Sequence, residues 1–94
     1  MTKRRYNTRI GNWVDGDSGF LSNGTPFRLV NVKAPEKHQF GGETATRRAA
    51  GITGRYNGRV TAIDYGKDKY GRHLLDLFNK DGHINERLRR KRRR

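Results

Sequence analysis

Residues 28–36 read RLVNVKAPE, an apolar run with alternating character that ends at a proline. Side chains alternate between two faces from residue 27 to residue 32, as they do in a β-strand with one buried face. Pro35 pushes Ala34 toward an extended conformation and ends strand pairing. The stretch therefore predicts a strand that runs into a turn, and it carries an arginine, a lysine and a glutamate close together.

Short runs rich in strand-forming residues lie on both sides of this strand, separated by glycine-rich turn sequences. We expect two strands before it, at 9–14 and 20–21, and two after it, at 59–65 and 73–78. Residues 41–50, GGETATRRAA, form the one plausible helix, and the glycines that follow break it. Five short strands with a helix between the third and the fourth is the element order of an OB-fold. The predicted fold is therefore mainly β: a five-stranded OB-fold barrel with small helices.

The charge of the chain predicts a polyanionic partner. Twenty-two lysines and arginines against nine aspartates and glutamates give a net charge of +13, and such an imbalance is typical of proteins that bind nucleic acid. The last six residues, RRKRRR, hold six of the positive charges, so the first 88 residues still carry +7. No amphipathic helix with a large apolar face accompanies the charge, which disfavours an anionic membrane as the partner.

Length and composition indicate one domain. The chain has 94 residues, and its apolar residues, 31% of the total, lie in short runs between twelve glycines. We expect a basic N-terminal arm at 1–8, the folded domain at 9–88 and a disordered basic tail at 89–94. Because the chain has no cysteine, disulfides and thiolate metal sites are excluded. The absence of a signal-peptide or membrane-spanning run predicts an intracellular, cytoplasmic protein.

Four motifs follow one another along the chain: DGDS at 15–18, FRLVNVKAPE at 27–36, DKYGR at 68–72 and DGHINERL at 81–88. In this order and at these spacings they resemble the staphylococcal-nuclease-like (thermonuclease) family, and the resemblance runs from about Arg9 to about Arg90. It implies a five-stranded barrel with a phosphodiesterase site for DNA and RNA, and a calcium ion bound beside that site.

The resemblance also implies roles for individual residues. Arg28 and Arg72 match two arginines that stabilise developing charge on the phosphate, which guanidinium groups can meet with bidentate hydrogen bonds. Glu36 matches the glutamate that orients the attacking water or takes its proton. Lys69 and Tyr70 match positions that contact a terminal phosphate of the bound nucleotide.

Lys33 departs from the family pattern. Asp17, in DGDS, matches one calcium-ligating carboxylate, but Lys33 stands where the family has another. An ammonium about 4 Å from a dication, at an effective dielectric of about 20, opposes binding by at most on the order of 8 kcal/mol. A micromolar site provides about the same free energy. Calcium is therefore disfavoured, and Lys33 either supplies positive charge near the phosphate itself or belongs to a site that only binds.

The chain also ends sooner than the family pattern. Family nucleases continue with a segment that covers the barrel and supplies base-stacking tyrosines, whereas here residues 85–90 predict only a helical turn or two before RRKRRR. We expect the tail to contact phosphates through charge alone. Its residues are Arg89, Arg90, Lys91, Arg92, Arg93 and Arg94.

Three functions remain open. The first is a nucleic-acid phosphodiesterase of low sequence specificity, metal-independent or weakly metal-assisted, centred on Arg28, Glu36 and Arg72. The second is a non-catalytic nucleic-acid-binding module, and the third is a basic component of a nucleoprotein or phage assembly. Glu36 favours the enzyme, because binding a polyanion gains nothing from a carboxylate. Lys33 and the short C-terminus favour the other two.

Overall fold

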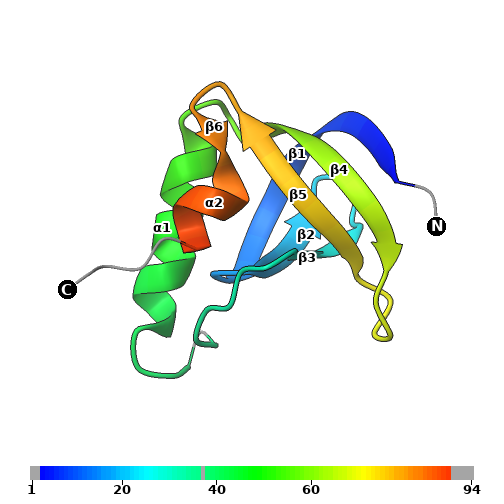
Figure 1. Ribbon diagram of the computed structural model, residues 1–94. Coiled ribbons are helices and arrows are strands. Elements are labelled where there is room, and N and C mark those ends of the chain that lie inside the picture. The colour runs from blue at the N-terminus through cyan, green and yellow to red at the C-terminus, as the bar shows by residue number, and fades with distance from the viewer. Residues whose placement is uncertain (1–2, 37, 90–94) are drawn as a thin grey trace.

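The computed structural model describes residues 3–36 and 38–89. Figure 1 shows a barrel of strands with both helices on one side of it. The elements in chain order are β1 (Arg4–Asp15), β2 (Ser18–Leu21), β3 (Pro26–Leu29), α1 (Gly42–Gly54), β4 (Arg59–Lys67), β5 (His73–Asn79), β6 (Gly82–His83) and α2 (Ile84–Arg89). Within these ranges, no helix has the length and apolar character needed to cross a bilayer.

The first five strands close into a barrel. They pair in the order β3-β2-β1-β4-β5, and β3 also pairs with β5, which joins the two edges. The β3–β5 ladder is parallel, and the other four ladders of the barrel are antiparallel. The short β6 adds two residues to the edge of β5. The prediction of a mainly-β, five-stranded barrel of the OB type is therefore confirmed.

The core fills the barrel and the space beneath α1. Trp13 meets Phe27 edge to face, with ring centroids 5.2 Å apart and an interplanar angle of 85°. The Trp13 indole Nε1 donates a hydrogen bond of 3.0 Å to Thr53 Oγ1, which ties α1 to β1. The fully buried large side chains come from β3, β5 and the start of α2: Phe27, Leu29, Leu75, Leu77 and Ile84.

The N-terminal arm predicted at 1–8 is wrong for the residues that the structure describes. β1 begins at Arg4 rather than at residue 9, and its residues 4–9 pair with β4 in an unbroken antiparallel register. The sequence did not predict this part of the strand, because its residues are basic or polar apart from Tyr6, the one large side chain with apolar surface in the segment. Tyr6 packs against the core, and its exposed neighbours Arg5 and Asn7 face outward.

Three other boundaries differ from expectation. β3 ends at Leu29, before the predicted residue 32, and Asn31 adopts a left-handed φ of 60°. α1 continues to Gly54 rather than ending at residue 50, because Ile52 and Thr53 are buried against the barrel and this packing outweighs the low helix propensity of glycine. Arg89 belongs to α2, so the basic tail predicted to begin at this residue is wrong there.

Asp64 links the beginning of β1 to β4 and β5. Its side chain is almost fully buried; Oδ2 accepts a 2.8 Å hydrogen bond from the Tyr6 hydroxyl and lies 2.8 Å from His73 Nδ1. Burial raises the pKa of Asp64, but hydrogen bonds from the Gly66 N–H, Tyr6 and His73 outweigh it, so the pKa lies below its usual value. Burial, followed by the bond to Asp64, raises the pKa of Tyr6 to about 12.

We predict that alkaline pH destabilises the fold through Tyr6. The Tyr6 pKa is higher in the folded protein than in the unfolded chain, so its contribution is complete below about pH 10 and is lost as the pH rises toward about 12. Tyr6→Phe removes a hydrogen bond to a carboxylate, so it should lower the free energy of unfolding at neutral pH by about 1.5–3 kcal/mol. It should also flatten the alkaline decline, as urea denaturation across this pH range would show.

The matched control is Tyr70→Phe, at an exposed ring. Its unfolding curves should superimpose on those of the native protein. A Tyr6→Phe protein with native stability at neutral pH would contradict the prediction.

Candidate phosphate-binding site

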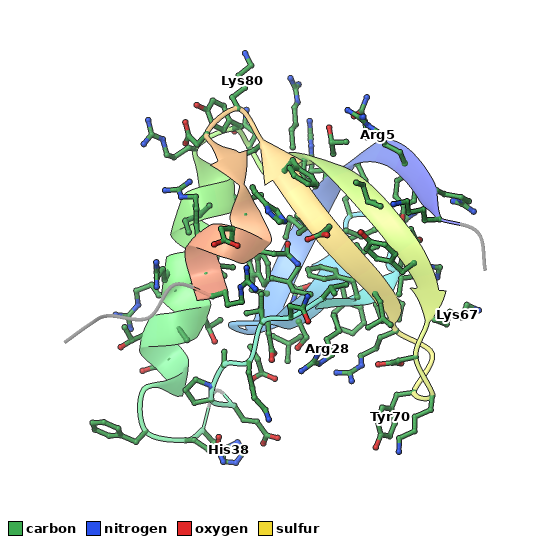
Figure 2. The ribbon with its side chains drawn as sticks, in the orientation of Figure 1. Arg5, Arg28, His38, Lys67, Tyr70 and Lys80 are labelled. Atoms are coloured by element: carbon green, nitrogen blue, oxygen red, sulfur yellow. The ribbon has the colours of Figure 1, made fainter. Side chains whose placement is uncertain are left out.

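The residues expected at the phosphate gather at one end of the barrel. They lie on the turn between β1 and β2, on β3, on the segment after β3, and on the turn between β4 and β5. Figure 2 shows Arg28, His38 and Tyr70 at this end, while Arg5 and Lys80 lie at the opposite end. Segments that are far apart in the sequence therefore supply one site.

Arg28 lies on β3, and the buried carboxylate of Asp17 holds its side chain in place. Its Nη2 lies 3.5 Å from Asp17 Oδ2, and its Nη1 donates to the carbonyl of Leu29 at 3.4 Å. The same Asp17 oxygen accepts a 3.3 Å hydrogen bond from the Ala34 N–H, so Asp17 joins the turn before β2 to β3 and to the segment after β3. Both contacts of the guanidinium are long, and its side chain is 30% exposed, which leaves donors available to an anion.

Arg72 is held more tightly, within its own turn. Its Nε and Nη2 donate to Asp68 Oδ2 at 3.0 and 2.9 Å, while Asp68 Oδ1 accepts from the backbone N–H groups of Tyr70 and Arg72. Burial raises the pKa of Asp68, but the hydrogen bonds from the backbone and the guanidinium lower it by more. The pKa of Asp68 therefore lies below its usual value. Asp68 therefore fixes both the turn and the direction of the Arg72 side chain.

The parallel ladder between β3 and β5 brings the two arginines to neighbouring positions. Arg28 pairs with Leu74, and Arg72 lies two residues before Leu74, directly before β5 begins at His73. In an ideal parallel ladder, with strands about 4.8 Å apart and a rise of about 3.3 Å per residue, residues offset by two positions on neighbouring strands have Cα atoms about 8 Å apart. One phosphate can therefore lie between two guanidinium groups.

Tyr70 extends this cationic surface. Its ring is 71% exposed, with Lys69 Nζ and Arg72 Cζ each 5.4 Å from the ring centroid. The structure thus brings together Lys69, Tyr70 and Arg72, with both cations near one aromatic ring. A nucleotide can meet both charge and a stacking surface here.

The structure does not place Glu36 against the two arginines. The carboxylate is largely exposed, and its ion pair within the described part of the chain is with His38, at 3.5 Å. The Glu36 backbone N–H donates to Gln39 Oε1 at 2.9 Å, and its carbonyl accepts from the Gln39 N–H at 2.8 Å. These bonds shape a turn whose carboxylate faces solvent at the same end as Arg28.

Asp17 has cationic surroundings. Arg28 is its ion-pair partner, and exposed Lys33 directly precedes the Ala34 that hydrogen-bonds to it. Over residues 3–36 and 38–89, no three His, Asp or Glu side chains are grouped so that they could hold a metal ion. Asp17 therefore serves as an anchor for Arg28 and for the segment after β3.

The basic tail contributes nothing that can be placed at this site. Arg89, in α2, pairs with Glu86, and α2 lies beside α1 on the far side of the barrel from Tyr70 (Figures 1 and 2). The other predicted tail contacts, Arg90, Lys91, Arg92, Arg93 and Arg94, lie outside the described residues.

Sequence reasoning missed two residues that position the site. Asp68 was noted only as part of DKYGR, although its spacing of four from Arg72 indicates an ion pair. Asn85 was noted only as part of DGHINERL, yet it is buried and holds β3 against β5. Its Nδ2 donates to the carbonyls of Val30 and Leu75, both at 3.0 Å, and its Oδ1 accepts from the Leu77 N–H at 2.9 Å.

Comparison with known proteins adds no relative: no model of a protein family and no curated protein matches the chain.

We predict that Asp68 stabilises the turn in two separable ways. Asp68→Asn keeps an acceptor for the backbone N–H groups but loses the ion pair, whereas Asp68→Ala loses both. Asp68→Ala should lower the free energy of unfolding more than Asp68→Asn does, because only Asp68→Ala also removes the acceptor of the two backbone hydrogen bonds. Urea denaturation would measure both. Glu43→Gln, which breaks an exposed pair with Arg47, should cost less than about 0.5 kcal/mol; equal losses in all three variants would contradict the prediction.

We predict that the native protein has no saturable calcium site tighter than about 1 mM, a free energy of about −4 kcal/mol. Arg28 and Lys33 oppose a dication at Asp17, whereas Lys33→Asp supplies a second carboxylate and should tighten binding. Calorimetric titration would measure both proteins. Lys80→Asp, at the opposite end of the barrel (Figure 2), makes the same charge change and should not tighten binding. A micromolar site in the native protein would contradict the prediction.

Proposed function

We propose that this chain is a phosphodiesterase of the thermonuclease type, which hydrolyses nucleic acid with low sequence specificity. The observation that carries the proposal is the position of Arg28 in β3 and of Arg72 directly before β5, the strand that pairs with β3 in parallel. Two guanidinium groups directed at one phosphate stabilise the charge that builds on its oxygens during hydrolysis.

The surroundings of this pair support a nucleic-acid substrate. Lys69 and Tyr70 lie beside Arg72, so a second phosphate or a base can bind next to the one under attack. The contacts address the sugar-phosphate backbone and a generic aromatic face, features shared by DNA and RNA, which accounts for low sequence specificity.

Glu36 is the carboxylate available at this end of the barrel to assist water. In the proposed reaction it accepts a proton as the water oxygen bonds to phosphorus, the bond from phosphorus to the leaving oxygen breaks, and solvent protonates the alkoxide. Glu36 must first exchange its contact with His38 for the water. Arg28 and Arg72 act together on the phosphate oxygens, and Lys33 adds positive charge, so the proposed reaction needs metal weakly or not at all.

A second function, binding without hydrolysis, is favoured by two observations. Glu36 pairs with His38 rather than lying beside the arginines, and Asp68 engages two nitrogens of Arg72. A module of this kind would keep the phosphate pocket but would not activate water. Turnover measurements separate the two functions.

We predict that Arg72→Ala lowers turnover on single-stranded DNA by about 10²- to 10³-fold, the loss typical of removing one donor to a charged transition state. Glu36→Gln should lower turnover similarly, because it removes the base with little change in shape, and it should bind the strand as tightly as the native protein or more tightly. Rates would be measured with calcium and with chelator.

The controls are Arg47→Ala and Glu43→Gln, which disrupt an exposed ion pair on α1 and should retain native turnover. The proposed hydrolysis is refuted if the native protein cleaves neither DNA nor RNA under any metal condition while Arg72→Ala and Glu36→Gln alter affinity only. That outcome would establish the binding module instead.

A further inference from the structure

A second basic surface lies away from the Arg28 end of the barrel. It is an open groove of about 1040 Å³ between the start of β1, the start of β4 and the turn after β5. Figure 2 shows two of its residues, Arg5 and Lys80, at the end opposite Arg28 and Tyr70. Five of its lining residues are basic and none is acidic; we call this surface the basic groove, and its cations are Arg5, Arg9, Arg55, Arg59 and Lys80.

Two of these arginines stand directly opposite each other. Arg9 of β1 and Arg59 of β4 are register partners, and both are exposed. Like charges directly opposite on an antiparallel pair destabilise a sheet. Within the described chain, no carboxylate lies at ion-pair distance from Arg5, Arg9 or Arg59. An anion bound between Arg9 and Arg59 would be attracted to both guanidinium groups and would offset their mutual repulsion.

The floor of the basic groove is polar and aromatic rather than charged. Asn7, Thr61 and Phe78 lie side by side on adjacent strands, because Asn7 pairs with Thr61 and Thr61 pairs with Phe78. The Thr61 hydroxyl donates a 2.9 Å hydrogen bond to Asn7 Oδ1. The Phe78 ring stacks on His83, with centroids 4.5 Å apart, so one of its faces is supported by another ring.

One wall of the basic groove is held in shape by Asp81. This carboxylate accepts a 2.9 Å hydrogen bond from the Tyr56 hydroxyl and lies 3.7 Å from Arg55 Nε. Lys80 Nζ lies 6.0 Å from the centroid of the Tyr56 ring. The Tyr56 ring therefore lies beside two cations on this wall, and clefts that bind single-stranded nucleic acid combine cations with aromatic rings in this way.

We infer that the basic groove binds a segment of single-stranded nucleic acid, with a phosphate between Arg9 and Arg59 and a base or sugar against Phe78 and Tyr56. The rings favour a nucleic acid over an acidic polypeptide, which would use the cations alone. The recessed floor disfavours a membrane, whose flat surface cannot reach it. The volume is that of a cleft for a small ligand, which suits a short length of single strand.

This inference does not depend on hydrolysis at the other end of the barrel. If the proposed phosphodiesterase activity is correct, the basic groove holds the strand some distance from the bond that is cleaved, and long strands bind more tightly than short ones. If that activity is absent, the basic groove still binds. The two proposals therefore fail in different experiments.

The test compares two variants of the intact protein that lose the same charge. One replaces Arg9 and Arg59 with glutamine; the other replaces the exposed α1 residues Arg47 and Arg48 with glutamine. The probe is a labelled oligothymidylate of about 16 nucleotides, the upper site size of one OB-fold. Binding is followed by fluorescence anisotropy over a range of salt concentrations, and the probe is checked for cleavage after each titration.

The variant lacking Arg9 and Arg59 should lose about tenfold in affinity, and its slope of log affinity against log salt should flatten by about 0.7, the value for one lost phosphate contact on a single strand. The α1 variant should change far less in both. The thermal unfolding midpoint without the probe should not fall, because a like-charge pair has been removed. Phe78→Leu should weaken binding with an unchanged salt slope, which isolates the contribution of the ring.

Cleavage provides a second readout. On a substrate with a single phosphodiester, too short to reach the basic groove, the variant lacking Arg9 and Arg59 should keep native turnover, whereas on long strands its KM should rise. The inference is overturned if the Arg9 and Arg59 variant binds the oligothymidylate as the α1 variant does. It is also overturned if that variant loses affinity only for polyglutamate or for phosphatidylserine vesicles.

Discussion

The parallel ladder between β3 and β5 is the contact on which the rest of the structure depends. It joins the two edges of the sheet, converts it into a barrel, and pairs Arg28 with Leu74. Parallel pairing of strands so far apart in the chain gains stability only after a long loop has been ordered. Asn85 offsets part of that cost, because its buried amide hydrogen-bonds to the carbonyls of Val30 and Leu75 and to the Leu77 N–H.

Carboxylates organise the end of the barrel that we propose is catalytic. Asp17 holds Arg28, and Asp68 holds Arg72, so each arginine has a direction before a ligand arrives and loses less conformational freedom when it binds. In the basic groove, by contrast, the paired arginines are not held by carboxylates of the described residues. Its register-paired Arg9 and Arg59 have no such partners within the described chain, so they retain more of their attraction for an outside anion. Arginines held in a fixed direction favour catalysis at a phosphate, whereas arginines without neighbouring carboxylates favour tight binding of an anion.

Much of the fold was predictable from short-range patterns. The strands around residues 27–29 and 73–78 are indicated by alternation and by the turn residues beside them, and the order of the strands with one intervening helix predicts the barrel. Prediction failed where local propensity and packing disagree. α1 runs through Gly51 because Ala49 and Ile52 are buried against the barrel, and β1 begins at Arg4 because β4 supplies a partner strand and Asp64 supplies a partner for Tyr6.

The sequence by itself determined the class of fold, the excess of positive charge and the residue types available for phosphate chemistry, because these depend on composition and on neighbours along the chain. The tertiary structure alone decided which of those residues meet. Arg28 and Arg72 come to neighbouring positions because two distant strands pair in parallel, whereas Glu36 faces solvent beside His38 because its turn bonds to Gln39. Arg9 and Arg59 are opposite each other through a register that only strand pairing sets. Distances between residues far apart in sequence are fixed by packing and hydrogen bonding, which no local pattern encodes.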